Sequence, residues 1–342
     1  MLRSLFAAFL GLAVCSAASP GKQAPVLRFE REIKLPGVLG RIDHLSADVA
    51  GQRVFVADLG NGSVEAFAVD RGERVGRIGG LKSPQGIVYV PANKTVYVAS
   101  GGDGMVRSYD GRTLKLLKTV VLGDDADNLR YDAQHKLVLA GYGSGAIAQL
   151  GLDLTRRSDL RLPVHPESFQ IAADGKRLFV NLPLHMSLAA IDLDTNVVNA
   201  TWGHPGTLAN FPMALDSAHG RMFVACRMPA RLLMIDTATG VVKGRIPTVG
   251  DSDDLYYDEA RQSIYVIGGG GFVDVVQVGP GDKLASAAHV ATAPGARTGL
   301  FVPEWNKLLV AAPRQGTSQA RLLVYSAAGA QPAPVAGKAR TR

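Results

Sequence analysis

Residue pairs, most of them polar, open seven segments of this sequence, and the segments are spaced roughly forty residues apart. The seven pairs are Asp43-His44, Pro84-Gln85, Asp127-Asn128, Glu167-Ser168, Phe211-Pro212, Asp253-Asp254 and Arg297-Thr298. Carboxylate and amide oxygens that converge from several segments suit a hard divalent cation such as calcium or magnesium. Clustered carboxylates also raise one another's pKa values, so one of them can act as a general base.

A motif with the same period indicates which elements position these pairs. Its first apolar residue falls, at spacings of 41 to 44 residues, at Val54, Val96, Leu137, Leu178, Met222, Ile264 and Leu308. Each copy is a short run of aliphatic and aromatic residues, which suits a strand covered on both faces. A period in the low forties is typical of one four-stranded propeller blade. The sequence therefore predicts an all-β, seven-bladed β-propeller.

The two ends of the repeat array predict how the ring closes. The seventh copy ends with its third strand at residues 321–325, and a spare alternating strand precedes the first copy at residues 26–33. We expect this N-terminal strand to pair with the last blade, which would protect otherwise open edges. The predicted divisions are a signal peptide at 1–18, the propeller at 19–326 and a disordered tail at 327–342, rich in Ala, Pro and Gly.

The first residues have the pattern of a secretory signal. Arg3 precedes an apolar stretch at residues 5–14, and Ser16-Ala17-Ala18 is a small-residue cleavage site. The stretch is shorter than the roughly 20 residues that cross a bilayer. We expect cleavage after Ala18 and a periplasmic or secreted protein with no transmembrane segment. A lipoprotein anchored through Cys15 is the less favoured alternative, because the residue before that cysteine is larger than usual.

Charge and cysteine content exclude some functions. The formal net charge is +7, but the leader and the tail carry four of these positive charges and leave +3 on the body. No basic run alternates with aromatic residues, which disfavours specific nucleic-acid binding. After cleavage Cys226 is the only cysteine, so no internal disulfide can form.

Two segments carry a family resemblance. Residues 236–247 read DTATGVVKGRIP and residues 172–181 read AADGKRLFVN. Both resemble the repeats of the YVTN-repeat family, the YncE-like exported bacterial propellers, and the similarity extends over residues 26–326. It departs from the family in the glycine-containing loops at 141–145 and 268–271. The resemblance implies a seven-bladed propeller outside the cytoplasm and assigns no catalytic residue.

The predicted fold places the polar pairs together. The innermost strand of each blade lines the central channel, so the starts of these strands share one rim. The predicted ligand-binding positions are Asp43, His44, Gln85, Asp127, Asn128, Glu167, Ser168, Asp253, Asp254 and Arg297. For a divalent cation the candidate ligands are Asn128, Glu167 and Asp254. The alternative is a hydrated channel rim whose polar residues bind nothing.

Loops on the same face carry softer groups. These are His165 and His204 in the connections into blades four and five, His185 and Met186 in blade four, and Cys226 with Met228 in blade five. Cys, His and Met together suit copper(I) or haem iron. Their spacing matches no metal motif, so the favoured interpretation is ordinary loop and packing residues.

Three functions are consistent with these patterns. No phosphate-binding loop, nucleophile elbow, paired-cysteine motif or haem attachment motif is present. The favoured hypothesis is a monomeric, non-enzymatic exported propeller whose loop face binds a small molecule, a polymer or a protein. The first alternative is a metal-dependent hydrolase resembling the gluconolactonase-type propellers, with Glu167, Asn128 and Asp253 or Asp254 around the ion. The second alternative, a quinone- or haem-linked electron-transfer propeller, is weakened by the missing haem motif and by only two tryptophans.

Overall fold

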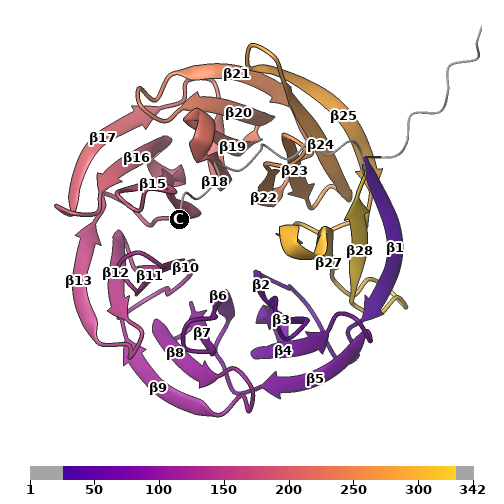
Figure 1. Cartoon of the computed structure of the whole chain (residues 1–342). Coiled ribbons are helices and arrows are strands. Elements are labelled where there is room, and N and C mark those ends of the chain that lie inside the picture. The colour runs from indigo at the N-terminus through magenta and orange to yellow at the C-terminus, as the bar shows by residue number, and fades with distance from the viewer. Residues whose placement is uncertain (1–25, 329–342) are drawn as a thin grey trace, which may run out of the picture.

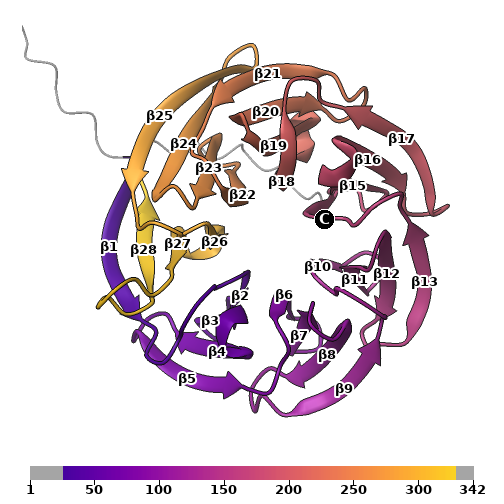
Figure 2. The ribbon, with the colours of Figure 1, turned by 180° about the vertical axis from the view of Figure 1, so that it is seen from behind.

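Seven four-stranded sheets surround a central channel in the computed structural model of the chain (Figure 1). The structure describes residues 26–328, so the predicted signal peptide and the tail beyond residue 328 lie outside the described residues. Neighbouring strands within each sheet are antiparallel. The view from behind shows the same closed ring (Figure 2). This confirms the predicted all-β, seven-bladed propeller.

Blades one to four follow one another along the chain, and in each the first strand lies innermost. Their strands are β2 (Leu45–Asp48), β3 (Arg53–Asp58), β4 (Ser63–Ala68) and β5 (Glu73–Ile78) in blade one; β6 (Pro84–Val90), β7 (Thr95–Ser100), β8 (Met105–Asp110) and β9 (Leu116–Val121) in blade two; β10 (Leu129–Asp132), β11 (Leu137–Tyr142), β12 (Ala146–Gly151) and β13 (Arg156–Arg161) in blade three; β14 (Phe169–Ile171), β15 (Arg177–Leu182), β16 (Ser187–Asp192) and β17 (Val197–Gly203) in blade four.

Blades five to seven complete the ring. Their strands are β18 (Leu208–Asp216), β19 (Arg221–Met228), β20 (Ala230–Asp236) and β21 (Val242–Pro247) in blade five; β22 (Ser252–Asp258), β23 (Ser263–Gly268), β24 (Phe272–Gly279) and β25 (Lys283–Ala291) in blade six; β26 (Thr298–Val302), β27 (Lys307–Ala312), β28 (Arg321–Ala327) and β1 (Leu27–Lys34) in blade seven. Four short 3₁₀ turns are η1 (Leu59–Asn61), η2 (Pro183–His185), η3 (Ser217–His219) and η4 (Pro303–Trp305). Across residues 26–328, no helix has the length and apolar character that a membrane crossing requires.

The N-terminal strand closes the ring as predicted. β1 pairs antiparallel with β28, with Ile33 opposite Leu322 and a register shift between Phe29 and Arg31. Ile33 is 1% exposed, and an ion pair of 3.2 Å joins Arg321 to Glu32. β28 runs through Ala327, one residue beyond the predicted end of the propeller. The last blade is therefore built from both ends of the described chain.

The second strand of each blade forms the core between neighbouring blades. The third residue of the second strand is at most 1% exposed in all seven blades: Phe55, Tyr97, Leu139, Phe179, Phe223, Tyr265 and Leu309. Such strands are covered on both faces, which explains their nearly continuous apolar sequence.

The structure corrects the repeat register in blade three. Leu137 opens β11 and is partly exposed, whereas Val138 is fully buried and holds the position that Val54 holds in blade one. The strand pairing agrees, since Leu129 lies opposite Ala140 as Leu45 lies opposite Val56. The predicted start of the apolar motif was one residue early, because the first residue of the second strand is a leucine in blade three and a polar residue in the other six blades.

Candidate functional site at the channel rim

One residue from each blade reaches the rim where the innermost strands begin. The strand pairing shows that these residues are equivalent. In blade one, for example, Leu45 pairs with Val56 in the middle of β3, and the rim residue Asp43 lies two positions before Leu45; the same offset holds in every blade. These rim residues are Asp43, Gln85, Asp127, Glu167, Phe211, Asp253 and Arg297, and all of them line two adjoining polar cavities, the larger about 190 Å³. The sequence alignment was one residue off in blade two, where Gln85-Gly86, not Pro84-Gln85, matches Asp43-His44.

Arginines neutralise one side of the rim. Arg41 lies 3.1 Å from the carboxylate of Asp43 and 3.6 Å from that of Asp253. Arg227 contacts Asp253 as well and donates from Nε to the backbone oxygen of Ser252 at 3.0 Å. Its guanidinium also lies 3.9 Å from the centre of the Phe211 ring. The carboxylates on this side therefore have cationic partners.

The opposite side of the rim gathers Asp127, His165 and Glu167. One ligand atom from each lies within 4.8 Å of the others. The Nδ1–H of His165 donates to the backbone oxygen of Gly143 at 2.6 Å, while Nε2 lies 4.0 Å from Asp127. A backbone acceptor on one ring nitrogen fixes the tautomer and leaves the other nitrogen as a ligand, as in many metal-binding histidines. We call these three residues the rim triad.

The two carboxylates of the rim triad lack arginine partners. Among residues 26–328, no arginine or lysine nitrogen lies within 4.0 Å of Asp127 or Glu167. Burial, followed by the nearby Asp43 and Glu167, raises the pKa of Asp127 to about 7. Burial and then Asp253 raise the pKa of Glu167 to about 7. A bound cation would offset this unfavourable concentration of negative charge.

Asn128 supplies a further oxygen beside the rim triad. It is 2% exposed, and its Oδ1 is buried without a hydrogen-bond partner among the described residues. It lines the smaller cavity together with Asp127 and Glu167. A buried carbonyl oxygen without a donor is costly, which a ligand in this cavity would relieve.

His44 and Asp254 are engaged with each other one layer below the rim. His44 Nδ1 lies 3.2 Å from Asp254 Oδ1, and the backbone N–H of Gly299 donates to Asp254 Oδ2 at 2.9 Å. Burial lowers the pKa of His44, but Asp254 and then Asp43 outweigh it and raise the pKa to about 10. The rim triad therefore includes Glu167 of the predicted cation ligands, places Asn128 beside it, and leaves Asp254 in an ion pair.

The remaining predicted positions have separate surroundings. Arg297 pairs with Asp251 at 2.9 Å, and the hydroxyl of Ser168 accepts from Arg130 at 3.4 Å. Cys226 is fully buried, and burial raises the pKa of its thiol to about 11. His204 is buried against Thr207 at 3.0 Å. These soft groups join no three-residue ligand cluster in the part of the chain that the structure describes.

The sequence analysis missed one regular signal. The residue two positions before the rim residue also reaches the rim cavities in blades one, three and four, as Arg41, Asp125 and His165. An alignment that also included the two residues before each pair would have added His165 to the predicted rim positions, together with Glu167. Arg227 comes from the end of β19, the second strand of blade five, and the alignment of first strands does not include that position.

Solved structures share the fold. A chain of Kuenenia stuttgartiensis hydrazine synthase has a TM-score of 0.71 at 15% identity, over 81% of this chain and 95% of that chain. A chain of the mitotic checkpoint complex has a TM-score of 0.75 at 16% identity, over 95% of this chain and 99% of that chain. The sequence matches no protein-family model and no curated protein. The comparisons therefore support the seven-bladed β-propeller fold, and a shared fold by itself assigns no function.

Proposed function

We propose that this protein is an exported, non-enzymatic binding propeller that holds a divalent cation at its channel rim. Asp127, His165 and Glu167 supply the ligands, and Asn128, which lines the smaller cavity with Asp127 and Glu167, would add its Oδ1 as a fourth. The observation that carries the proposal is their convergence within 4.8 Å beside a buried amide oxygen without a partner.

The ligand types narrow the choice of cation. Calcium and magnesium were expected from oxygen ligands alone, and they prefer oxygen. A histidine nitrogen beside two carboxylates instead suits manganese or zinc. We therefore propose manganese or zinc, with the cavity side of the ion left open to a small polar ligand or to a partner's side chain.

The export part of the proposal rests on the sequence. The predicted signal at residues 1–18 and the YVTN-repeat resemblance both favour a protein outside the cytoplasm. The mass of the mature N-terminus tests it: cleavage after Ala18 supports export, whereas a retained Met1 contradicts it.

Thermal unfolding with added cations tests the rim site. We expect manganese or zinc, but not magnesium, to raise the melting temperature relative to EDTA, because a ligand present at about 100 times its Kd adds ~2.7 kcal/mol to stability. Glu167→Gln should remove most of that rise, because it deletes a charged ligand. In EDTA the same variant should melt at or above the wild-type temperature, because charge repulsion falls.

Glu259→Gln is the matched control. Glu259 is exposed in the turn after β22, at the other end of the innermost strand from the rim. This variant should keep the full cation response. An equal response in both variants, or none in the wild type, would reject the rim site.

A metal-dependent hydrolase is the second candidate. It is favoured by Arg41, Arg227 and Arg297, which line the same cavity as the rim triad and would attract an anionic substrate. The test is hydrolysis of lactones and phosphate esters with and without manganese. Turnover that disappears in Glu167→Gln would favour the hydrolase over the binding protein.

A further inference from the structure

Another cavity, separate from the two at the rim, lies in the channel beyond the His44–Asp254 pair. It measures about 360 Å³. In each blade, the residue three positions after the rim residue lines it. All seven blades contribute one residue at this level: Ser46, Val88, Arg130, Gln170, Ala214, Tyr256 and Leu300. We call these residues the channel ring.

Most of this cavity is apolar. Besides Val88, Ala214 and Leu300 of the channel ring, Ile87 and Leu215 line it. A preformed cavity of this size, apolar with a few convergent polar groups, is typical of a small-molecule site. Its lining differs from that of the rim cavities, where charged residues dominate.

Arg130 is the charged group of the channel ring. Its guanidinium donates to the backbone oxygen of Leu129 at 2.7 Å and to Ser168 Oγ at 3.4 Å, and lies 5.6 Å from the centre of the Phe169 ring. Within residues 26–328, no carboxylate lies within 4.0 Å of it. Burial lowers its pKa, although Arg remains protonated at neutral pH. Arg130 is partly buried in the channel, and a partly desolvated cation without an ion-pair partner is unfavourable.

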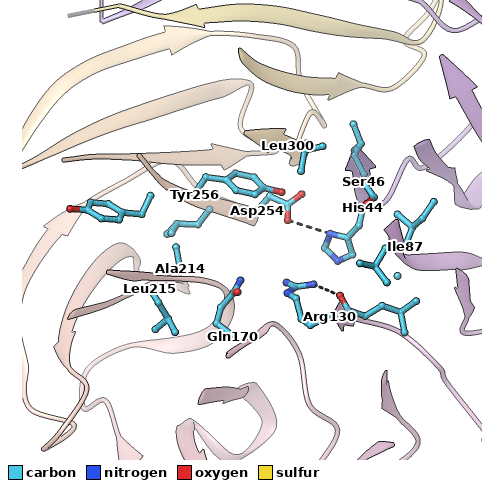
Figure 3. Close-up of a pocket in the computed structure, with 16 residues that line it drawn as sticks. His44, Ser46, Ile87, Arg130, Gln170, Ala214, Leu215, Asp254, Tyr256 and Leu300 are labelled. Atoms are coloured by element: carbon cyan, nitrogen blue, oxygen red, sulfur yellow. Dashed lines mark hydrogen bonds and ion pairs between the residues drawn. The ribbon is translucent and has the colours of Figure 1, made fainter. Parts of the chain in front are cut away.

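The neighbours of Arg130 do not supply a negative charge that neutralises its guanidinium. Asp254 is already paired with His44, which is itself cationic at neutral pH. Gln170 donates from Nε2 to the backbone oxygen of Met213, and Tyr256 donates its hydroxyl hydrogen to the backbone oxygen of Gly299. Figure 3 shows Arg130, Gln170 and His44 pointing into one space from different blades. The charges of Arg130, His44 and Asp254 therefore sum to one positive charge.

We propose that this cavity binds a small monocarboxylate with an apolar body. Arg130 would pair with the carboxylate, and Gln170 would add a hydrogen bond to it. Ile87, Val88, Ala214 and Leu300 would cover the hydrocarbon part. An aliphatic chain of about eight carbons or an aromatic acid has this chemistry, and the ligand requires no cation at the rim.

Titration calorimetry with octanoate at neutral pH tests the proposal. The wild type should bind octanoate, and Arg130→Met should weaken binding by at least about tenfold, because it deletes a charge-assisted hydrogen bond. Arg130→Lys should restore part of the affinity, because it returns the charge without the fork geometry. Arg245→Gln, an exposed change on β21 with the same loss of charge, should bind like the wild type.

Four further measurements distinguish the ligand class and the role of Arg130. Octanol, which has the tail without the charge, and inorganic phosphate, which has charge without the tail, should both fail to bind. Glu167→Gln should leave octanoate binding unchanged, which separates this site from the rim. Without ligand, Arg130→Met should melt at or above the wild-type temperature, because an unpaired, partly buried charge is removed.

Several outcomes would overturn the proposal. These are no octanoate binding by the wild type, equal binding by the wild type and Arg130→Met, or binding of phosphate in place of octanoate. A lower melting temperature of ligand-free Arg130→Met, together with unchanged octanoate affinity, would assign Arg130 a purely structural role.

Discussion

The acidic residues of the rim differ in what balances their charge. Asp43 and Asp253 have arginines within 4 Å, whereas among residues 26–328 no arginine lies that close to Asp127 or Glu167, on which Arg227 and His44 act only at longer range. The same residue type is therefore part of an ion pair on one side of the channel and a candidate ligand on the other. Side-chain chemistry alone does not separate these roles, because they depend on which cation each carboxylate reaches.

At the residue scale, His44 should make stability depend on pH. Asp254, Asp43 and Asp127 act on it, and its pKa of about 10 in the folded protein exceeds the ordinary value of 6.5. Its stabilising contribution is therefore complete below about pH 6.5 and is lost as the pH rises toward 10. We expect the free energy of unfolding to fall more steeply between pH 7 and 10 in the wild type than in His44→Gln.

Denaturant unfolding at a series of pH values measures this difference. His185→Gln is the control and should follow the wild-type slope, because His185 is exposed on η2 and contacts the hydroxyl of Ser187. Parallel curves for the wild type and His44→Gln would show that the ion pair with Asp254 does not stabilise the folded protein.

The innermost strands provide two kinds of position. Alternate residues of a strand point to opposite faces. Asn128 and Arg130 therefore share the face toward the channel, while Leu129 between them is 1% exposed in the hydrophobic core. β10 and the residue before it thus present one side chain to a rim cavity and another to the deeper cavity, and His44 with Ser46 and Ser168 with Gln170 repeat this arrangement in blades one and four.

At the element scale, β1 should be required for a stable last blade. Ile33 is 1% exposed and packs in the hydrophobic cluster that contains Val54 and Leu322. We expect Ile33→Ala to lower the free energy of unfolding by about 2–4 kcal/mol, because it leaves a cavity in a packed core. Denaturant unfolding provides the measurement.

Arg28→Ala is the control for the same strand. Arg28 is exposed on β1, so its truncation should change stability by less than about 0.5 kcal/mol. If Ile33→Ala were as mild as this control, β1 would not be an integral part of the blade.

At the scale of the whole molecule, the closed ring should protect its interior thiol. Cys226 is fully buried on β19, and burial raises its thiol pKa to about 11. Opening of the ring is required before a reagent reaches it, because every blade packs between two neighbours. In a Cys15→Ser background we expect labelling by a disulfide reagent to be at least about 100-fold slower in native buffer than in denaturant.

The deletion of residues 26–33 provides the comparison for this experiment. Removal of β1 exposes the edge of β28 and should accelerate labelling of Cys226 in native buffer. Rapid labelling of the intact protein would instead mean that the fifth blade opens independently of the ring.

The sequence by itself determined the architecture. The period of the motif, the apolar second strands and the missing last strand are local patterns, and they predicted seven blades closed by the N-terminal strand. The leucine at position 137 displaced the register by one residue, because apolar character alone does not mark where a buried strand begins. The polar rim was also predicted, since equivalent positions of repeated blades must meet around one axis.

Only the tertiary structure decided which rim residues act together. His44 and Asp254 are more than 200 residues apart, and only the folded chain shows that they form an ion pair. His165 joined Asp127 because the loop before β14 carries its ring toward the neighbouring blade. Arg130 has no ion pair within 4.0 Å among residues 26–328, because the nearby Asp254 pairs with His44 instead. Such contacts depend on loop paths and on distances across the ring, which a repeat period does not encode.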